Sequence, residues 1–147
     1  DSAGKYAYSL DLGTYRIYVE PEFATTGAAG AYSASCPITD TSTVTTCNLT
    51  LAAPNTSGTF TIGGIAPRNG NIRFIPASGV ANNTAKNNFY ARFGNTGKFG
   101  ANVEPGTYRL SIYYNTNAGS NTVNGGLCVV PNSGQVVCDV NLPSTNL

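Results

Sequence analysis

The side chains best suited to chemistry in this sequence are four cysteines in two local pairs. Cys36 and Cys47 enclose ten residues, and Cys128 and Cys138 enclose nine. An even count at matched spacing predicts two local disulfides, each tying neighbouring strands together. A zinc site is the weaker interpretation, because these spacings lack the C-x2-C pairing of zinc ligands. We therefore expect an oxidising location, secreted or on a cell surface.

The acidic residues offer little else for catalysis. Glu20 and Glu22 flank Pro21 and would share one face of an extended segment, as a cation site or an acid–base pair requires. A solvated strand end, blunted by proline and charge, is the simpler interpretation. Asp40 lies in a Thr/Ser-rich loop and is expected to be a turn residue. A calcium site would need six to eight oxygen ligands, and the sequence has no Asp-rich loop to supply them. The chain has no histidine, which excludes Ser-His-Asp and Cys-His units and histidine-ligated zinc. We predict no catalytic residue, no metal, no cofactor and no enzyme activity.

Charged residues make up only 10% of the 147 residues, and the net charge is +1. Eight scattered basic residues give no footprint for nucleic acid or an anionic membrane. The longest apolar stretch is far short of the roughly 20 residues that cross a bilayer, so no membrane insertion is expected. Asn, Thr, Ser and Gly make up 43% of the chain. Such neutral polar faces do not repel one another, which suits packing of copies or a coat of glycans.

An internal repeat with an offset near 93 residues organises the chain. The first two matches lie 93 positions apart, and the cysteines follow at offsets of 92 and 91. The matched segments are 4–6 (GKY) with 97–99 (GKF), 13–17 (GTYRI) with 106–110 (GTYRL), and 47–51 (CNLTL) with 138–142 (CDVNL). Chance does not produce a collinear series of this kind. The repeat therefore predicts two related modules.

The two modules are unequal in length. Residues 56–147 form one complete module, whereas residues 1–55 match only its second half, from Gly94 onward. Either the chain is a piece of a longer array, or strands from another copy complete the first half-module in trans. We expect the exchanged element to lie in the first strands of the complete module. Its residues are Thr59, Phe60, Ile62, Ile72 and Phe74.

Alternation with period two dominates the pattern, which predicts strands rather than helices. Seven short strands in about 90 residues, separated by turn signals, favour an antiparallel β-sandwich of immunoglobulin-like or transthyretin-like type. The chain would hold about one and a half such modules. Residues 104–106 (EPG) predict a type II turn. Residues 123–130 and 135–142 predict a hairpin, with the second cysteine pair across it.

A family resemblance rests on residues 90–99 (YARFGNTGKF) and 103–110 (VEPGTYRL). They resemble the carboxypeptidase regulatory-like (transthyretin-like) family over about residues 57–142. The family pattern is a strand, a turn that ends in Gly-Lys/Arg-Phe/Tyr, then Pro-Gly-Thr/Tyr-Tyr and a final pair of strands. The resemblance implies a non-catalytic module of secreted enzymes, adhesins or surface proteins, although the cysteine pair departs from the family pattern. The turn motif comprises Gly13, Tyr15, Pro105, Gly106 and Tyr108, and its tyrosine hydroxyls are expected to bond back to the turn backbone.

Two surface features leave glycans open as partners. Asn48, Asn55 and Asn82 fit the acceptor pattern for N-glycosylation. Six tyrosines are candidates for a sugar-stacking platform, against the alternative of cross-strand packing: Tyr6, Tyr8, Tyr18, Tyr32, Tyr113 and Tyr114. Our leading hypothesis is an extracellular structural protein whose modules form a stalk, surface fibre or filament with copies of itself. The alternative is a carbohydrate-binding or adhesin module of a secreted protein.

Overall fold

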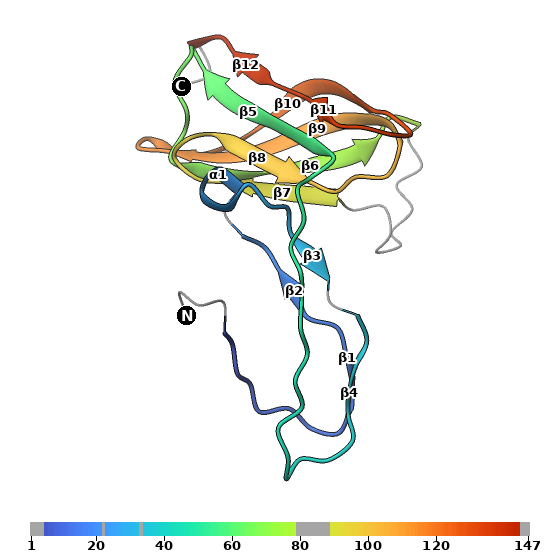
Figure 1. Ribbon diagram of the computed structural model, residues 1–147. Coiled ribbons are helices and arrows are strands. Elements are labelled where there is room, and N and C mark those ends of the chain that lie inside the picture. Colours follow the sequence, from blue (N-terminus) through green and yellow to red (C-terminus); the bar gives the residue numbers. More distant parts are fainter. Residues whose placement is uncertain (1–4, 22, 33, 79–88, 145–147) are drawn as a thin grey trace. The chain divides into compact units, whose positions relative to one another are not determined.

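A computed structural model describes residues 5–21, 23–32, 34–78 and 89–144 (Figure 1). It divides into two compact units. We call the first, Asp1–Val19 with Ala31–Thr50, the half-module, and the second, Glu20–Gly30 with Leu51–Leu147, the complete module. Residues 20–30 and 51–55 of the predicted 1–55 segment therefore belong to the complete module. The reason is packing, because Phe23 lies against Gly100 and Ala29 donates a backbone hydrogen bond to Ala52.

The complete module is a sandwich of two sheets (Figure 1). One sheet is antiparallel, in the order β10-β9-β6-β7, and in the other β5 pairs with β8, β11 and β12. The strands are β5 (Thr56–Ile62), β6 (Asn69–Pro76), β7 (Phe89–Phe93), β8 (Lys98–Ala101), β9 (Gly106–Thr116), β10 (Gly119–Val130), β11 (Val136–Val137) and β12 (Val140–Leu142). A short helix, α1 (Phe23–Thr26), contacts β7 and β8. The predicted all-β sandwich is confirmed.

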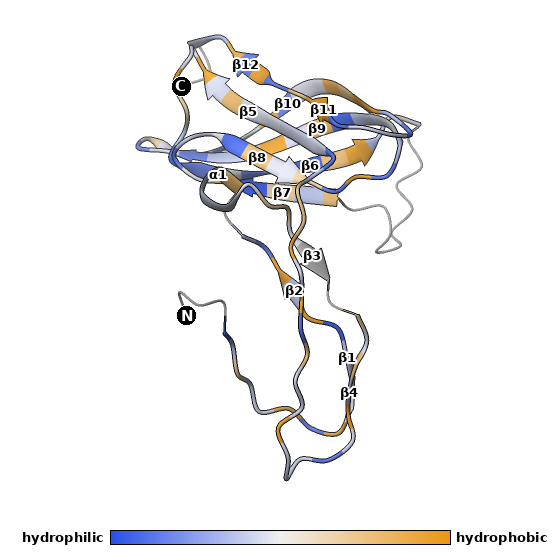
Figure 2. Cartoon of the chain, in the orientation of Figure 1, coloured by the Kyte–Doolittle hydropathy of each residue, from blue (hydrophilic) through white to orange (hydrophobic). Residues whose placement is uncertain are grey.

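The core lies between these two sheets. Every second residue of β5 is buried, as a strand with one face inward requires. Its Phe60 ring packs against Tyr114 of β9 at 5.3 Å and Phe93 of β7 at 5.6 Å between ring centroids. Figure 2 shows apolar and polar stretches mixed along the strands, as this alternation requires. Full burial of each such side chain stabilises by about 1.5–3 kcal/mol, so β5 is central to the fold.

The predicted hairpin of residues 123–130 and 135–142 is wrong. β10 pairs with β9, whereas β11 and β12 pair in parallel with β5 in the opposite sheet. The chain crosses between sheets because Val140 is apolar and completes the core from the β5 side. The Cys128–Cys138 disulfide therefore joins the two sheets and does not bridge a hairpin.

The predicted type II turn at residues 104–106 is also wrong. A type II turn needs a φ near about +80° at its third residue. Gly106 has a φ of 156° and already belongs to β9. The chain turns through a bend at Pro105 and enters the strand at once.

The half-module contains two short antiparallel ladders. β1 (Gly13–Tyr15) pairs with β4 (Cys36–Ile38), and β2 (Tyr18–Val19) pairs with β3 (Ala31–Tyr32). The second disulfide predicted from spacing, Cys36–Cys47, lies in this unit. Within the described residues, no helix is long and apolar enough to span a membrane.

Candidate functional site: the open half-module

The half-module repeats the β9–β10 ladder of the complete module in the same register. Tyr15 faces Cys36 in β1 and β4, as Tyr108 faces Cys128 in β9 and β10. The next pairs match as well, at Gly13 with Ile38 and Gly106 with Val130. The repeat in sequence is therefore a repeat in backbone pairing.

The correspondence continues beyond an irregularity in the ladder. Tyr18 pairs with Tyr32, and their counterparts Ser111 and Asn124 pair in the complete module. In both units, one strand of the ladder carries the tyrosine that faces the cysteine, and the other carries the cysteine. Between these two paired positions, the cysteine strand has one residue more than the tyrosine strand. The register shift thus lies at the same position in both copies. The offsets of the sequence repeat alone do not predict that position.

A tyrosine fixes the start of this ladder in both copies. The Tyr15 hydroxyl donates a hydrogen bond to the Asp11 carbonyl oxygen at 3.0 Å, and Tyr108 donates to the Glu104 carbonyl oxygen at 2.9 Å. The expected bond back to the turn is present in both units. Burial, and secondly the Glu104 carboxylate, raise the pKa of Tyr108. Tyr108 therefore remains a hydrogen-bond donor to well above neutral pH.

In both units a tyrosine ring lies over the glycine at the start of the ladder. A Cβ at Gly13 would lie 3.3 Å from the Tyr15 hydroxyl oxygen, and one at Gly106 would lie 3.4 Å from the Tyr108 ring. The Gly-Thr-Tyr pattern therefore reflects a ring that covers the glycine two residues before it.

Strands are absent from the half-module where their counterparts pair with β5. In the complete module, β8, β11 and β12 all pair with β5. The corresponding residues 6–8 and 45–50 form no strand. The segments that do form strands, β1 to β4, match β9 and β10 of the complete module, which pair with each other. The half-module therefore contains the part of the sandwich that forms without β5, β6 and β7.

The same comparison explains an unusual exposure of apolar side chains. Tyr6 is 45% exposed, whereas its counterpart Phe99 is fully buried at 0%. Leu10 is 42% exposed, whereas its counterpart Val103 is 1% exposed. Tyr8 is 82% exposed at a position where the complete module has a buried alanine. These side chains form an uncovered apolar surface, which we call the open face: Tyr6, Tyr8 and Leu10.

A contact across the half-module occupies the place where β5 would run. The Tyr6 hydroxyl donates a hydrogen bond to the carbonyl oxygen of Cys47. In the complete module, Gly58 lies between their counterparts. A Cβ built on Gly58 would lie 2.6 Å from the Phe99 ring and 2.5 Å from the Cys138 carbonyl oxygen. The slot between Tyr6 and Cys47 is thus the counterpart of the β5 site.

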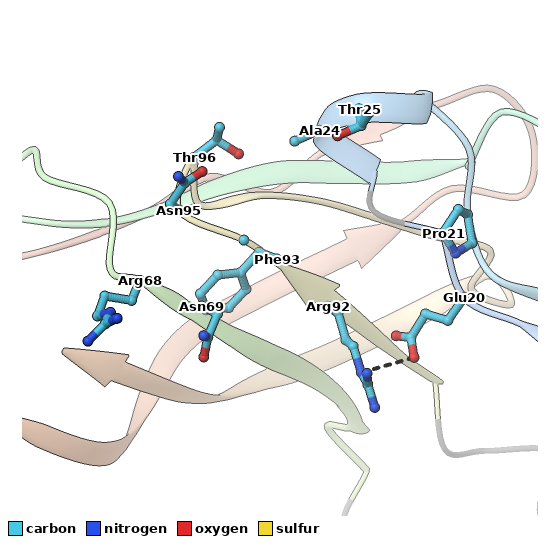
Figure 3. A pocket seen from close by; sticks show the side chains of 11 residues that line it. Glu20, Pro21, Ala24, Thr25, Arg68, Asn69, Arg92, Phe93, Asn95 and Thr96 are labelled. Carbon is cyan, nitrogen blue, oxygen red and sulfur yellow. Dashed lines mark ion pairs between the residues drawn. The ribbon is translucent and has the colours of Figure 1, made fainter. Parts of the chain in front are cut away.

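The complete module carries a separate cavity of about 710 Å³. In Figure 3 the side chains of Glu20 and Arg92 face each other on one side of it, joined by an ion pair of 3.1 Å between Glu20 Oε2 and Arg92 Nε. Arg68, Asn95 and Thr96 lie on the other side. Glu22, the other carboxylate of the predicted pair, lies outside the described residues.

Burial dominates the electrostatics of this carboxylate. The Glu20 side chain is only 12% exposed, and its Oε1 atom has no hydrogen-bond partner among the described residues. Burial raises the pKa of Glu20, while the Arg92 guanidinium acts in the opposite direction. Among the described residues that line this cavity, Glu20 is the one carboxylate, and it is paired with Arg92.

Asp40 is a turn residue, as its surroundings predict. Its Oδ1 accepts hydrogen bonds from the backbone nitrogen of Ser42 at 2.8 Å and from the Ser42 hydroxyl at 2.7 Å. The Ser42 bonds, with a weaker one from Thr43, lower the pKa of Asp40. Within the described part of the chain, no group of three or more His, Cys, Asp or Glu residues could hold a metal ion.

The predicted glycan acceptors differ in their surroundings. Asn48 is exposed, and Asn82 lies outside the described residues. Asn55 is half-buried, and its Nδ2, the atom that carries an N-glycan, donates to the Val103 carbonyl oxygen at 2.8 Å. Its Oδ1 accepts from the Val103 backbone nitrogen at 3.0 Å. Asn55 thus joins two segments of the fold, which makes it the least suitable acceptor of the three.

The residues predicted for strand exchange fill the core of their own module. Phe60, Ile62, Ile72 and Phe74 are all 0% exposed, and Thr59 is half-buried on the outer side of β5. Sequence reasoning missed the slot between Tyr6 and Cys47. The repeat identifies Phe99 as the counterpart of Tyr6, but the pairing of Gly58 with Phe99 is known only from the structure.

The tyrosines predicted as a platform differ in exposure and belong to both units. Tyr113 and Tyr114 point to opposite faces of β9, at 40% and 1% exposure. Tyr6 and Tyr8 belong to the open face, and Tyr18 is half-buried. For Tyr32 only the backbone pairing with Tyr18 is described.

Comparisons with known proteins give no relative for this chain: no family model, no curated protein and no solved structure matches it. Its function must therefore be argued from its own geometry.

Proposed function

We propose that this chain is an extracellular structural protein whose β-sandwich modules join into a fibre through the open half-module. The observation that carries the proposal is the exposure of Tyr6 and Leu10, whose counterparts Phe99 and Val103 are core residues. In the complete module, β5 to β7 cover the residues that correspond to the open face. We therefore expect strands of the same kind to cover the open face. Exposed apolar faces of this kind mark sites of association.

The chain cannot cover the open face with its own β5. In the complete module β12 lies parallel to β5, with Val140 facing Phe60 and Asn141 facing Thr61. The counterparts of Val140 and Asn141 are Leu49 and Thr50, and only residues 51–55 separate Thr50 from β5. A parallel pair needs a crossover of a dozen or more residues. The covering strands must therefore come from another copy or another module.

The described residues contain two ladders of the β9–β10 type and one β5–β7 strand set. Strand donation from one copy to the open face of the next is a head-to-tail contact, because the two copies contribute different surfaces. A head-to-tail contact generates a filament when its rotation does not close into a ring.

Location and surface support the same proposal. Two disulfides suggest an oxidising, extracellular-type environment. Only 10% of the residues are charged, so like-charge repulsion between copies is weak. A relation to the carboxypeptidase regulatory-like family, with its immunoglobulin-like sandwich, belongs to this proposal and accords with a non-catalytic surface module.

Electron microscopy and sedimentation of the oxidised full chain test the fibre. We expect filaments or concentration-dependent polymers, and dispersed monomers at high concentration would contradict the proposal. Leu10→Asp places a charge on the open face without touching the core of the complete module, so it should abolish the polymers. Val44→Asp is the matched control, because Val44 is 96% exposed outside the open face and its replacement should change nothing.

A carbohydrate-binding or adhesin module is the second candidate, supported by one surface of the complete module. Asn71, Arg73, Tyr90 and Arg92 line a cavity of about 450 Å³ on β6 and β7. Tyr90 is 42% exposed, and an accessible ring beside amide and guanidinium groups suits sugar stacking. A glycan array tests this, and Tyr90→Ala should abolish any binding found. Binding that survives Tyr90→Ala would count against the surface.

A further inference from the structure

We propose that the slot between Tyr6 and Cys47 takes a β5-type strand from another module of this repeat, in the register that the complete module shows. The incoming strand has the sequence of Thr56–Ile62 and brings its β6 and β7 with it. This deepens the proposed fibre function, on which it rests for its biological partner, by naming the partner strand and its contacts.

One side of the slot defines an antiparallel pairing. In the complete module Thr56 faces Ala101, Ser57 faces Gly100 and Gly58 faces Phe99. Transferred through the repeat, the incoming Thr56 faces Tyr8 and the incoming Gly58 faces Tyr6. Residues 6–8 form no strand in the half-module, so this edge is available to pair.

The other side of the slot defines a parallel pairing. Val140 faces Phe60 and Asn141 faces Thr61 in the complete module. Their counterparts are Leu49 and Thr50, which also form no strand. In addition, the backbone nitrogen of Cys138 donates to the Ser57 carbonyl oxygen at 2.8 Å. The backbone nitrogen of Cys47 is expected to donate in the same way to the incoming Ser57.

Gly58 determines which strand the slot can accept. The strand passes so close to Phe99 and the Cys138 carbonyl that a Cβ at this position would lie within 2.6 Å of both. Real Cβ atoms do not approach so closely, and one of the two obstacles is backbone. A β-strand with any side chain at this position is therefore excluded. The slot selects a strand with glycine opposite the aromatic residue.

Tyr6 covers the empty slot and must move when the strand enters. Its hydroxyl donates to the Cys47 carbonyl oxygen in the open half-module. The incoming Gly58 backbone needs the space between these two groups, so that hydrogen bond must break. Phe99, which lacks the hydroxyl, stands at this position in the filled site and is fully buried. Tyr6 thus serves as a removable cover.

The test supplies the strand set within one chain. Residues 54–93 are placed directly before Asp1, because Asp1 is the counterpart of Gly94 and the connection to the half-module then has its natural length. Amide hydrogen exchange is measured at residues 6–8 and 49–50. Strand capture should slow exchange there by about tenfold or more relative to the parent chain, measured at a concentration where sedimentation shows the parent to be monomeric. β8 of the complete module serves as an internal reference in both chains.

The matched control carries Gly58→Val in the added copy only. It should restore fast exchange at residues 6–8 and 49–50 while β8 stays protected. Slow exchange that persists with valine, or fast exchange in the unmodified extension, would overturn the proposal. Should the extended chain not fold, a peptide of residues 55–64 added to the intact chain gives the same measurement, with its Gly58→Val form as control. The peptide should slow exchange where its valine form does not, and equal effects of the two would again overturn the proposal.

The fibre can fail separately from the slot. If the parent chain forms no polymer but the extended chain shows glycine-dependent protection, the slot is correct and the fibre is wrong. If the parent chain polymerises and Leu10→Asp polymers persist, copies join elsewhere. Protection that is absent from the extended chain contradicts the slot whatever the parent chain forms.

Discussion

The hydroxyl of Tyr6 donates a hydrogen bond to the carbonyl oxygen of Cys47, although their counterparts Phe99 and Cys138 have a strand between them. The same two positions of the repeat are thus in contact in one unit and separated in the other. The difference follows from what surrounds them, since the half-module has no β5 to place there. An empty site and a filled site of one kind are present in a single chain.

Removing the Tyr6 hydroxyl should favour strand capture. Tyr6→Phe deletes the hydrogen bond to Cys47 that must break when the strand enters, and it reproduces the residue of the filled site. A hydrogen bond contributes about 0.5–1.5 kcal/mol net, so the apparent affinity for the peptide of residues 55–64 should rise about threefold to tenfold. Titration followed by hydrogen exchange measures this rise.

Tyr8→Phe is the control for that variant. Tyr8 is 82% exposed and belongs to the same open face, but the hydrogen bond to the Cys47 carbonyl oxygen comes from Tyr6. Equal gains from both variants would show that the effect arises from general hydrophobicity and not from release of the slot.

Gly58→Ala should destabilise the complete module itself. The added Cβ meets the Cys138 carbonyl and the Phe99 ring, and overpacking of this kind costs about 1–3 kcal/mol. Urea unfolding gives the loss in free energy of unfolding. Thr59→Ala, one residue further along β5 and half-buried on its outer side, should cost clearly less. An unchanged stability in Gly58→Ala would remove the argument for a glycine-selective slot.

The sequence allowed prediction of local and repeated features, but not of how distant strands pair. The sandwich, the cysteine pairs and the tyrosine bonds to the turn depend on neighbours in sequence or on the repeat. The hairpin at residues 123–142 failed because alternation is the same whether a strand joins its neighbour or the opposite sheet. β12 joined the opposite sheet because β5 presented an edge there, which no local pattern records. The slot was missed for the same reason.

The two disulfides should contribute to different units. Replacing Cys128 and Cys138 by serine removes the bond between the sheets of the complete module and should lower its stability by about 2–4 kcal/mol. Replacing Cys36 and Cys47 should leave the unfolding of the complete module unchanged, because that bond lies in the half-module. Hydrogen exchange at β9 separates the two outcomes. A similar loss at β9 in both variants would contradict this assignment.

The tyrosine at the start of each ladder should stabilise its own unit and not the other. Tyr108 is 6% exposed, and Tyr108→Phe removes its bond to the Glu104 carbonyl, leaving a stability loss of about 1 kcal/mol. Tyr15→Phe removes the equivalent bond to Asp11 in the half-module and should not change the unfolding of the complete module. Thermal unfolding of the two variants beside the parent chain compares them directly.

Glu20 should make the complete module less stable as pH rises above the ordinary range of glutamate titration. Burial raises its folded pKa above 4.5, so the folded state holds the proton more tightly than the unfolded state does. Its stabilising contribution is present below pH 4.5 and is lost as pH rises through the raised pKa. Glu20→Gln cannot titrate, so its stability relative to the parent should increase between pH 4 and pH 7. Urea unfolding across that range measures the difference. Because the pKa of Asp40 is lowered, Asp40→Asn should show the opposite sign in the unfolding of the half-module, with stability relative to the parent increasing as pH falls below 3.8. A difference between Glu20→Gln and the parent that is constant with pH would show that the ion pair with Arg92 fully offsets the burial.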